Sequence, residues 1–293
     1  MPEKIAEVNG VQLCHETFGS PDGRPLLMIM GLASQMIWWD ELCENLAAEG
    51  FYVIRYDNRD SGRSSRMTGR ANLPLAYALR TAPYSLADMA GDAAGLLTAL
   101  GVESAHVVGA SMGGMVAQTL AIEYPSRVRS LTSIMSTTGN RFVGRPSAKA
   151  MAMLLTAPPR GREEYVDSLV RTFRVIGSPG YPFDEARMRE RAERSFDRGV
   201  DPGGTARQLA AIVSSRDRFR ALRKLEVPAL VVHGSKDPLV HVSGGRATAR
   251  ALRESEVDIV PGMGHDLPRA IWPRLTRALV RTADRADVKT RRA

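Results

Sequence analysis

The sequence predicts an α/β fold in which helices cover both faces of a mostly parallel sheet. Short apolar runs of strand length alternate with longer segments of helical period along most of the 293 residues. Runs such as Pro25–Met30 are apolar throughout, which is typical of strands buried on both faces of a parallel sheet. The alternation stops between about residues 141 and 217, where helical segments follow one another without a convincing strand. We therefore expect one sheet domain (1–140 and 218–293) that is interrupted by a helical insertion (141–217).

Hydrophobic periodicity and turn residues place the individual elements of this domain. Before the insertion, strands are expected at 10–19, 25–30, 51–57, 104–109 and 128–135, and helices at 38–50, 85–101 and 111–125. After the insertion, strands are expected at 228–234 and 255–262, and helices at 244–254 and 267–283. The helix 85–101 has signals at both ends, since Ser85 is a good N-cap residue and Gly101 is a good terminator. Gly50 is a good terminator of the helix 38–50.

The net charge is +8, and the arginines are scattered along the chain rather than gathered in one run. The segment 187–199 mixes arginine with glutamate and aspartate, a pattern that predicts a solvated helix face with i,i+4 ion pairs. The polar segment 281–293 is expected to be a frayed tail. Because no nucleic-acid-binding motif accompanies the positive charge, the sequence predicts no nucleic-acid partner.

The remaining compositional signals favour a cytoplasmic protein without a membrane anchor. No apolar stretch is long enough to cross a bilayer, and residues 1–10 lack the apolar region of a secretory signal. The two cysteines, Cys14 and Cys43, form neither a CxxC motif nor a cluster with histidine, so we expect buried thiols and no metal site. No glycine-rich phosphate-binding loop follows the first strand, so no dinucleotide cofactor is expected.

A single serine stands where a predicted strand turns into a predicted helix. The segment Gly109–Gly113 fits the pattern G-x-S-x-G, in which the serine adopts a strained turn and bulky neighbours would clash. Such a turn exposes the hydroxyl at the carboxyl edge of the sheet, where open α/β sheets bind ligands. A serine that merely caps a helix is the competing interpretation, so the role of Ser111 as a nucleophile depends on partners elsewhere in the chain.

A serine hydroxyl becomes a strong nucleophile when a base takes its proton and an acid orients that base. Of the five histidines, His15, His106 and His233 lie within predicted strands. His265 follows the last strand in a glycine-rich loop that can bring an imidazole over the sheet edge, so it is the predicted base. His241 is the second candidate, because it lies in a loop near the end of the same sheet.

The acid that orients the histidine is expected in a loop at the same edge of the sheet. The loop that follows the strand 228–234 supplies Asp237, and Pro238 constrains the turn behind it. Asp266 adjoins His265, but neighbouring residues seldom point correctly at each other's ring nitrogens. Asp237 is therefore the predicted acid, and a simple turn-capping role is the competing interpretation.

Acyl transfer also needs backbone donors for the oxyanion that develops during attack. The N–H of Met112, directly after the serine, is the first predicted donor. The N–H of Leu32 is the second, because Gly31 allows a tight turn where its strand ends. We expect the same connection to contact the substrate through Gly31, Trp38 and Trp39, with the two tryptophans as an apolar wall.

Four motifs, in the right order, resemble those of the α/β-hydrolases. Tyr56–Ser65 is similar to their D-x-R-x-x-G-x-S loop, and Gly109–Gln118 to their nucleophile elbow. His233–Val240 is similar to their acid loop, and Pro261–His265 to their histidine loop. The resemblance covers nearly the whole chain outside the insertion. Within the family, the sequence is most similar to small-molecule carboxylesterases of the anthracycline (aclacinomycin-type) methylesterase branch.

One position departs from the pattern of many relatives, which have His-Gly before the oxyanion residue. This chain has Met30-Gly31. The methylesterase branch also resembles Met-Gly there, so we interpret the departure as membership of that branch.

The resemblance implies an α/β-hydrolase fold with a mostly parallel eight-stranded sheet, flanking helices and the insertion 141–217 as a helical cap over Ser111. It implies a triad of Ser111, Asp237 and His265 that hydrolyses small-molecule esters through an acyl-enzyme, without a metal or organic cofactor. A lactonase, a C–C bond hydrolase or a cofactor-free haloperoxidase can use the same triad. A non-catalytic ligand-binding homologue can keep the same fold.

The class of substrate is expected to depend on the insertion. Segments 148–159 and 164–177 are amphipathic, with methionine and leucine on one face. Such faces often pack only against the core, but next to Trp38 and Trp39 they can also form the wall of a pocket. In the second case we expect esters of hydrophobic, polycyclic acids with small alcohols.

Overall fold

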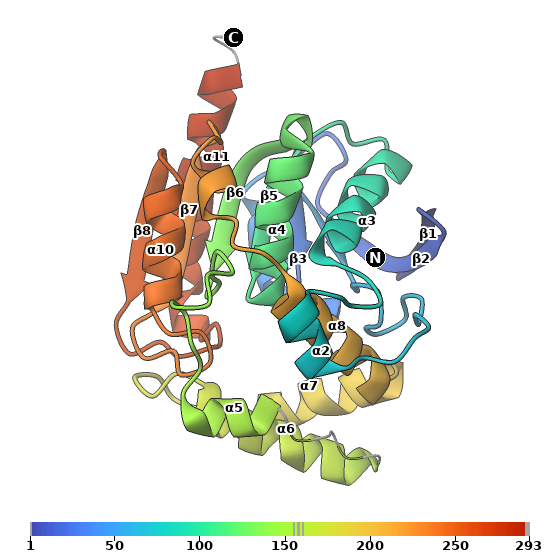
Figure 1. Cartoon of the computed structure of the whole chain (residues 1–293). Helices are drawn as coiled ribbons and strands as arrows, with labels where there is room; N and C mark the ends of the chain where they lie inside the picture. Colours follow the sequence, from blue (N-terminus) through green and yellow to red (C-terminus); the bar gives the residue numbers. More distant parts are fainter. Residues whose placement is uncertain (1, 155, 157–158, 160, 291–293) are drawn as a thin grey trace.

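The chain folds around one sheet of eight strands (Figure 1), and the computed structural model describes residues 2–154, 156, 159 and 161–290. The strands are β1 (Lys4–Val8), β2 (Val11–Phe18), β3 (Arg24–Ile29), β4 (Phe51–Tyr56), β5 (Ala105–Ala110), β6 (Val128–Ile134), β7 (Ala229–Gly234) and β8 (Ser255–Val260). They lie side by side in the order β1-β2-β4-β3-β5-β6-β7-β8. β2 is antiparallel to both of its neighbours, and all other pairs are parallel. The predicted α/β fold is confirmed.

Helices cover both faces of this sheet. The helical elements are η1 (Met36–Trp39), α1 (Asp40–Ala48), α2 (Leu73–Leu79), α3 (Leu86–Ala99), α4 (Met112–Glu123), η2 (Pro125–Arg127), α5 (Ala148–Leu154), α6 (Arg162–Ile176), α7 (Glu185–Arg198), α8 (Pro202–Ser214), α9 (Phe219–Leu222), α10 (Ser243–Ala251), η3 (Arg269–Ile271) and α11 (Trp272–Thr290). One apolar core lies under α3, α4 and α10, and a second lies on the opposite face under α1 and α11. Ser85 caps α3 as predicted, in a capping box with Asp88.

The chain leaves the sheet after β6 and returns to it at β7. Helices α5, α6, α7 and α8 and the short helix α9 lie in this excursion, and the described part of residues 141–217 contains no strand. Figure 1 shows α5, α6 and α7 crossing one end of the sheet rather than covering either face. α6 and α7 pack against each other, and α7 also approaches η1 of the sheet domain.

Several elements differ from the sequence-based expectation, among them the short helix α9, which was not predicted. The apolar pattern did not predict β1, because this short strand buries just Ala6 and Val8. It also did not predict α2, a seven-residue helix that begins with Asn72 as N-cap. The expectation of a frayed tail over residues 281–293 was wrong as far as Thr290, because α11 continues to that residue with the side chains of Ala283 and Ala286 buried. Residues 291–293 lie outside the described part of the chain.

We also compared the helices with the requirements of a membrane span. Within the described residues, no helix combines the length and the apolar composition that crossing a bilayer needs.

Candidate active site

Ser111 stands at the sharp turn between β5 and α4. Its φ of 55° and ψ of −120° lie in a region that residues with side chains rarely adopt. The glycines around it have no room for a side chain. A Cβ on Gly113 would lie 2.1 Å from the carbonyl oxygen of Ile29, and one on Gly109 would lie 2.1 Å from that of Gly113. The pattern G-x-S-x-G is thus explained by close backbone packing that exposes the serine hydroxyl.

Three polar side chains from separate loops meet at the carboxyl end of the sheet. Ser111 Oγ lies 2.9 Å from Nε2 of His265, and Nδ1 of His265 lies 2.8 Å from Oδ2 of Asp237. His265 is 7% exposed and Asp237 is 4% exposed, so water has little access to their contact. In this arrangement an imidazole can accept the hydroxyl proton while a carboxylate holds its tautomer. The structure therefore brings together the three residues that the sequence analysis selected.

Asp237 is held in its ionised form. Its Oδ1 accepts the backbone N–H groups of Leu239 and Val240 at 2.9 and 2.8 Å. Burial by itself raises the pKa of this carboxyl, but the charge of His265 and the hydrogen bonds from His233 and His265 outweigh burial. The pKa of Asp237 consequently lies well below the usual aspartate range. The carboxylate stays negative at neutral pH and can stabilise a protonated imidazole.

The two alternative residues of the sequence analysis lie in other contacts. His241 is exposed, and its Nδ1 lies 3.0 Å from Oγ of Ser243. Asp266 accepts a hydrogen bond from the Ser178 hydroxyl, and burial raises the pKa of its carboxyl. The geometry therefore selects His265 as the imidazole next to Ser111, and Asp237 as the carboxylate next to that imidazole.

The connection after β3 lies directly against the serine. A Cβ added to Gly31 would lie 3.2 Å from Cβ of Ser111, so a larger residue there would crowd the hydroxyl. The backbone N–H groups of Leu32 and Met112 donate to no residue in the described part of the chain. Two backbone donors next to Ser111 are thus without a protein acceptor.

A cavity of about 640 Å³ opens beside Ser111. Its wall from the sheet domain includes the three residues predicted for substrate contact, Gly31, Trp38 and Trp39, and also Leu32, which was predicted as a donor to the oxyanion. Its wall from the inserted helices includes Met153, Leu169, Phe173, Ile176 and Met188. The Trp38 ring packs against Phe173 with 5.1 Å between centroids, and its Nε1 donates to Ser195 Oγ at 3.1 Å. Leu155, Ala157 and Pro158 of the amphipathic segment 148–159 lie outside the described residues.

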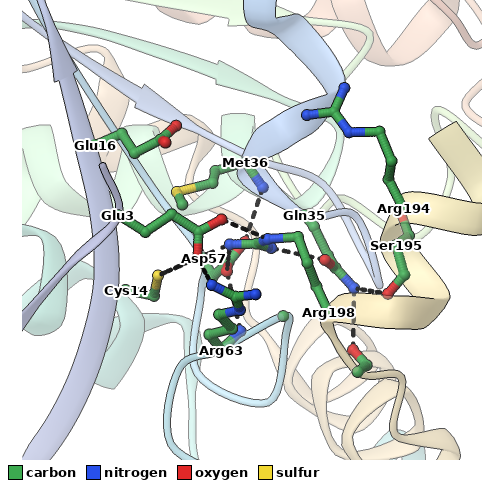
Figure 2. A network of polar contacts seen from close by, with 12 residues as sticks. Glu3, Cys14, Glu16, Gln35, Met36, Asp57, Arg63, Arg194, Ser195 and Arg198 are labelled. Carbon is green, nitrogen blue, oxygen red and sulfur yellow. Dashed lines mark hydrogen bonds and ion pairs between the residues drawn. The ribbon is translucent and has the colours of Figure 1, made fainter. Parts of the chain in front are cut away.

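The sequence analysis missed a polar network that joins α7 to the sheet domain (Figure 2). Arg198, the last residue of α7, donates to Glu3 and Asp57 at 2.8 Å each and to the Gln35 side-chain oxygen at 2.7 Å. Asp57 also accepts the backbone N–H of Met36 at 2.8 Å. Because Gln35 and Met36 belong to the connection after β3, the network holds that connection against α7.

A second missed contact comes from α8. The side-chain oxygen of Gln208 accepts the N–H of Ala33 at 2.9 Å, while its Nε2 donates to Arg59 O and Ser61 Oγ. Ala33 has a φ of 56°, which is unfavourable for alanine, and Gln208 satisfies its amide. The motif Tyr56–Ser65 was the one sequence feature that pointed to these contacts, because it contains Arg59 and Ser61. It does not indicate which residues of α7 and α8 they contact.

The charged segment 187–199 is only in part the solvated helix face that the sequence predicted, with Glu190, Arg194 and Asp197 exposed. An i,i+4 pair between Arg189 and Glu185 is present at 3.4 Å. However, the Arg198 side chain is 7% exposed and reaches Asp57, and Arg191 lines the cavity. The prediction was wrong for Arg191 and Arg198, because charge alternation indicates neighbours along one helix, whereas a long arginine side chain can reach another element.

We expect Arg198→Met to lower the free energy of unfolding by about 3 kcal/mol or more, because it leaves buried Asp57 without its cation. Arg194→Met is the matched control from the same helix. Arg194 pairs with Asp40 at 2.8 Å, but its side chain is 44% exposed, so we expect a loss below about 1 kcal/mol. Urea unfolding of the two variants makes the comparison, and equal losses would contradict the structural role of Arg198.

The chain is similar to known hydrolases in both sequence and structure. The family described as alpha/beta hydrolase fold matches residues 24–268. Rhodomycin D methylesterase DauP of Streptomyces sp. (strain C5) is 32% identical over 95% of this chain and 97% of its own length. Rhodomycin D methylesterase DnrP of Streptomyces peucetius is 31% identical over the same shares. Among solved structures, the enol-lactonase from Burkholderia xenovorans LB400 superposes with a TM-score of 0.76 at 22% identity, covering 95% of this chain and 99% of that one.

The resemblance inferred from the motifs is confirmed by these comparisons. The family match spans most of the chain, from β3 to the loop after His265, and the methylesterases align along nearly its full length. The chain therefore belongs to the alpha/beta hydrolase fold family.

Proposed function

We propose that this esterase-type hydrolase cleaves carboxylic esters of small molecules through a covalent acyl-enzyme on Ser111. The observation that carries the proposal is the chain of contacts from Ser111 through His265 to Asp237, at 2.9 and 2.8 Å, beside a largely apolar cavity. The relatives named methylesterases support an ester as the scissile group.

In the proposed reaction, Nε2 of His265 takes the proton of Ser111 while Oγ attacks the ester carbonyl carbon. Asp237 accepts from Nδ1 and stabilises the imidazolium that forms. His265 then gives its proton to the leaving alcohol, which leaves the acyl group on the serine. A water molecule, deprotonated by His265, attacks the acyl-enzyme and releases the acid.

The backbone N–H groups of Leu32 and Met112 are the donors that we propose for the tetrahedral intermediate. Support comes from their lack of an acceptor in the described part of the chain and from the close approach of Gly31 to Ser111. Donors that are already in place stabilise the developing negative charge without reorganisation.

We further propose that residues 141–217 act as a cap that selects the substrate. The inserted helices contribute methionine, leucine and aromatic side chains to the wall that faces Trp38 and Trp39. Methionine is adaptable and aromatic side chains offer large flat surfaces, so such a wall suits bulky apolar groups. We therefore expect an ester of a bulky hydrophobic acid with a small alcohol.

Steady-state kinetics on matched substrates test this expectation. Methyl esters of bulky aromatic acids should have kcat/KM values about tenfold or more above those of short aliphatic esters, because more apolar surface is buried on binding. Aminoacyl amides should be poor substrates. A clear kcat/KM preference for aminoacyl amides would instead place the protein among peptide-cleaving relatives.

A direct experiment separates an enzyme from a ligand-binding homologue. Purified protein should turn over a chromogenic ester, and a serine-directed phosphonate should abolish the turnover while adding one phosphonyl group at Ser111, detected by mass spectrometry. Binding of esters without turnover, and without phosphonylation, would show that the fold serves as a receptor.

A further inference from the structure

The cavity beside Ser111 is lined by charged side chains that hydrolysis of a neutral ester does not use. Three basic side chains line it, those of Lys149, Arg171 and Arg191. Three carboxylates also line it, those of Asp60, Asp201 and Asp266. Some of these six side chains already have a hydrogen-bond or ion-pair partner within the protein, and others do not.

Each of the three carboxylates is already engaged. Arg207 donates to both oxygens of Asp60 at 2.8 and 2.9 Å, and to Asp201 at 2.9 Å. Asp266 accepts from the Ser178 hydroxyl, and burial raises the pKa of its carboxyl. Each of the three therefore already has a hydrogen-bond partner in the protein, and Asp60 and Asp201 share the guanidinium of Arg207.

Arg191 has no such partner. Its guanidinium is partly buried, and it makes no hydrogen bond or ion pair with any residue that the structure describes. Three carboxylates act on it electrostatically without forming an ion pair with it. Asp40 pairs with Arg55 and Arg194, Glu41 pairs with Arg187 and Arg269, and Asp266 accepts from Ser178. An arginine that has lost part of its hydration without gaining a partner is costly to the protein, which suggests that its partner is a ligand.

The charge state of Arg191 and the basic residues around the cavity also favour an anionic ligand. Burial and the charge of neighbouring Arg187 lower the pKa of Arg191 to about 10, so the side chain is still cationic at neutral pH. Lys149 and Arg171 are exposed and line the same cavity, where they can attract an anion from solution. The chain as a whole has a net charge of +8, which adds to this attraction.

We propose that Arg191 binds an anionic oxygen of the substrate, so that the preferred ester carries a free carboxylate on its acyl portion. The proposal rests on the proposed function, because a small leaving alcohol has no room for a second charged group. A guanidinium can form two parallel hydrogen bonds with a carboxylate, which would orient the acid while the ester carbonyl lies at Ser111. The substrate class is then a monoester of a bulky dicarboxylic acid.

The first test uses two methyl esters that differ only in charge. One is the monomethyl ester of naphthalene-2,6-dicarboxylic acid, and the other is the neutral carboxamide made from it. We expect the wild-type protein to have a kcat/KM about 10- to 100-fold higher for the anionic ester. Arg191→Gln should remove this ratio, Arg191→Lys should keep part of it, and Arg194→Gln, on the same helix outside the cavity, should leave it unchanged. A wild-type ratio near one, or a ratio that survives in Arg191→Gln, would overturn the proposal.

The second test does not depend on turnover. Calorimetric titration with 2-naphthoate and 2-naphthamide measures whether the cavity prefers the anion in the wild-type protein and in Arg191→Gln. Naphthoate should bind about tenfold or more tightly, and Arg191→Gln should abolish the difference. Anion binding through Arg191 without hydrolysis of either ester would contradict the proposed function and leave the anion site standing. Hydrolysis of both esters with equal binding of the two probes would contradict the anion site alone.

Discussion

Ser111→Ala is expected to reduce kcat for ester hydrolysis by about 10⁴-fold or more, because no other group can form the acyl-enzyme. His265→Ala should cause a loss of similar size, since the hydroxyl then has no base at 2.9 Å. The double variant should be no slower than either single variant. Residues that act as one unit show such non-additive losses.

The measurement is kcat on a methyl ester of a bulky aromatic acid, together with thermal unfolding of each variant. Alanine removes one hydroxyl from Ser111, so the melting temperature should stay close to that of the wild-type protein. Ser215→Ala is the matched control, because the Ser215 hydroxyl bonds only to the Ile212 carbonyl in its own helix end. A Ser111→Ala protein that is folded and fully active would eliminate the triad mechanism.

The second large effect is expected at the acid. Asp237→Asn should lower kcat by about 10³- to 10⁴-fold, whereas Asp266→Asn should lower it less than about tenfold. The asparagine amide would present N–H groups toward Nδ1 of His265, favour the wrong tautomer and leave the imidazolium without a counter-charge. Asp266 bonds to Ser178 rather than to the imidazole ring, so its change should alter packing more than chemistry.

These two aspartates form a useful pair, because Asp237 is buried, Asp266 is partly buried, and both lie close to His265. Circular dichroism and the melting temperature should show that both variants fold. If kcat fell more in Asp266→Asn than in Asp237→Asn, the acid would have been assigned to the wrong loop.

Much of the candidate site could be predicted because its signals are local. The turn at Ser111 requires small residues at Gly109 and Gly113, and this requirement is visible in five consecutive letters of the sequence. Asp237 and His265 follow predicted strands of one parallel sheet, and the carboxyl ends of such strands meet at one edge. The choice between Asp237 and Asp266 followed from the same reasoning about loops.

Other contacts could not be predicted, because they join segments that are far apart in the chain. Nothing near Arg198 indicates that it reaches Asp57, and nothing near Gln208 indicates that it accepts the amide of Ala33. Arg191 was counted among solvated charges for the same reason, although it lines the cavity.

The sequence by itself determined the fold class, the turn at Ser111 and the choice of His265 and Asp237, because these depend on periodicity, steric limits and strand order. Only the tertiary structure decided which helices roof the cavity and which arginines of α7 face solvent, the sheet domain or the cavity. The physical reason is the length of the arginine side chain. A periodic pattern specifies the face on which a side chain leaves its helix, whereas an arginine side chain is long enough to select a partner from whichever element packs beside it.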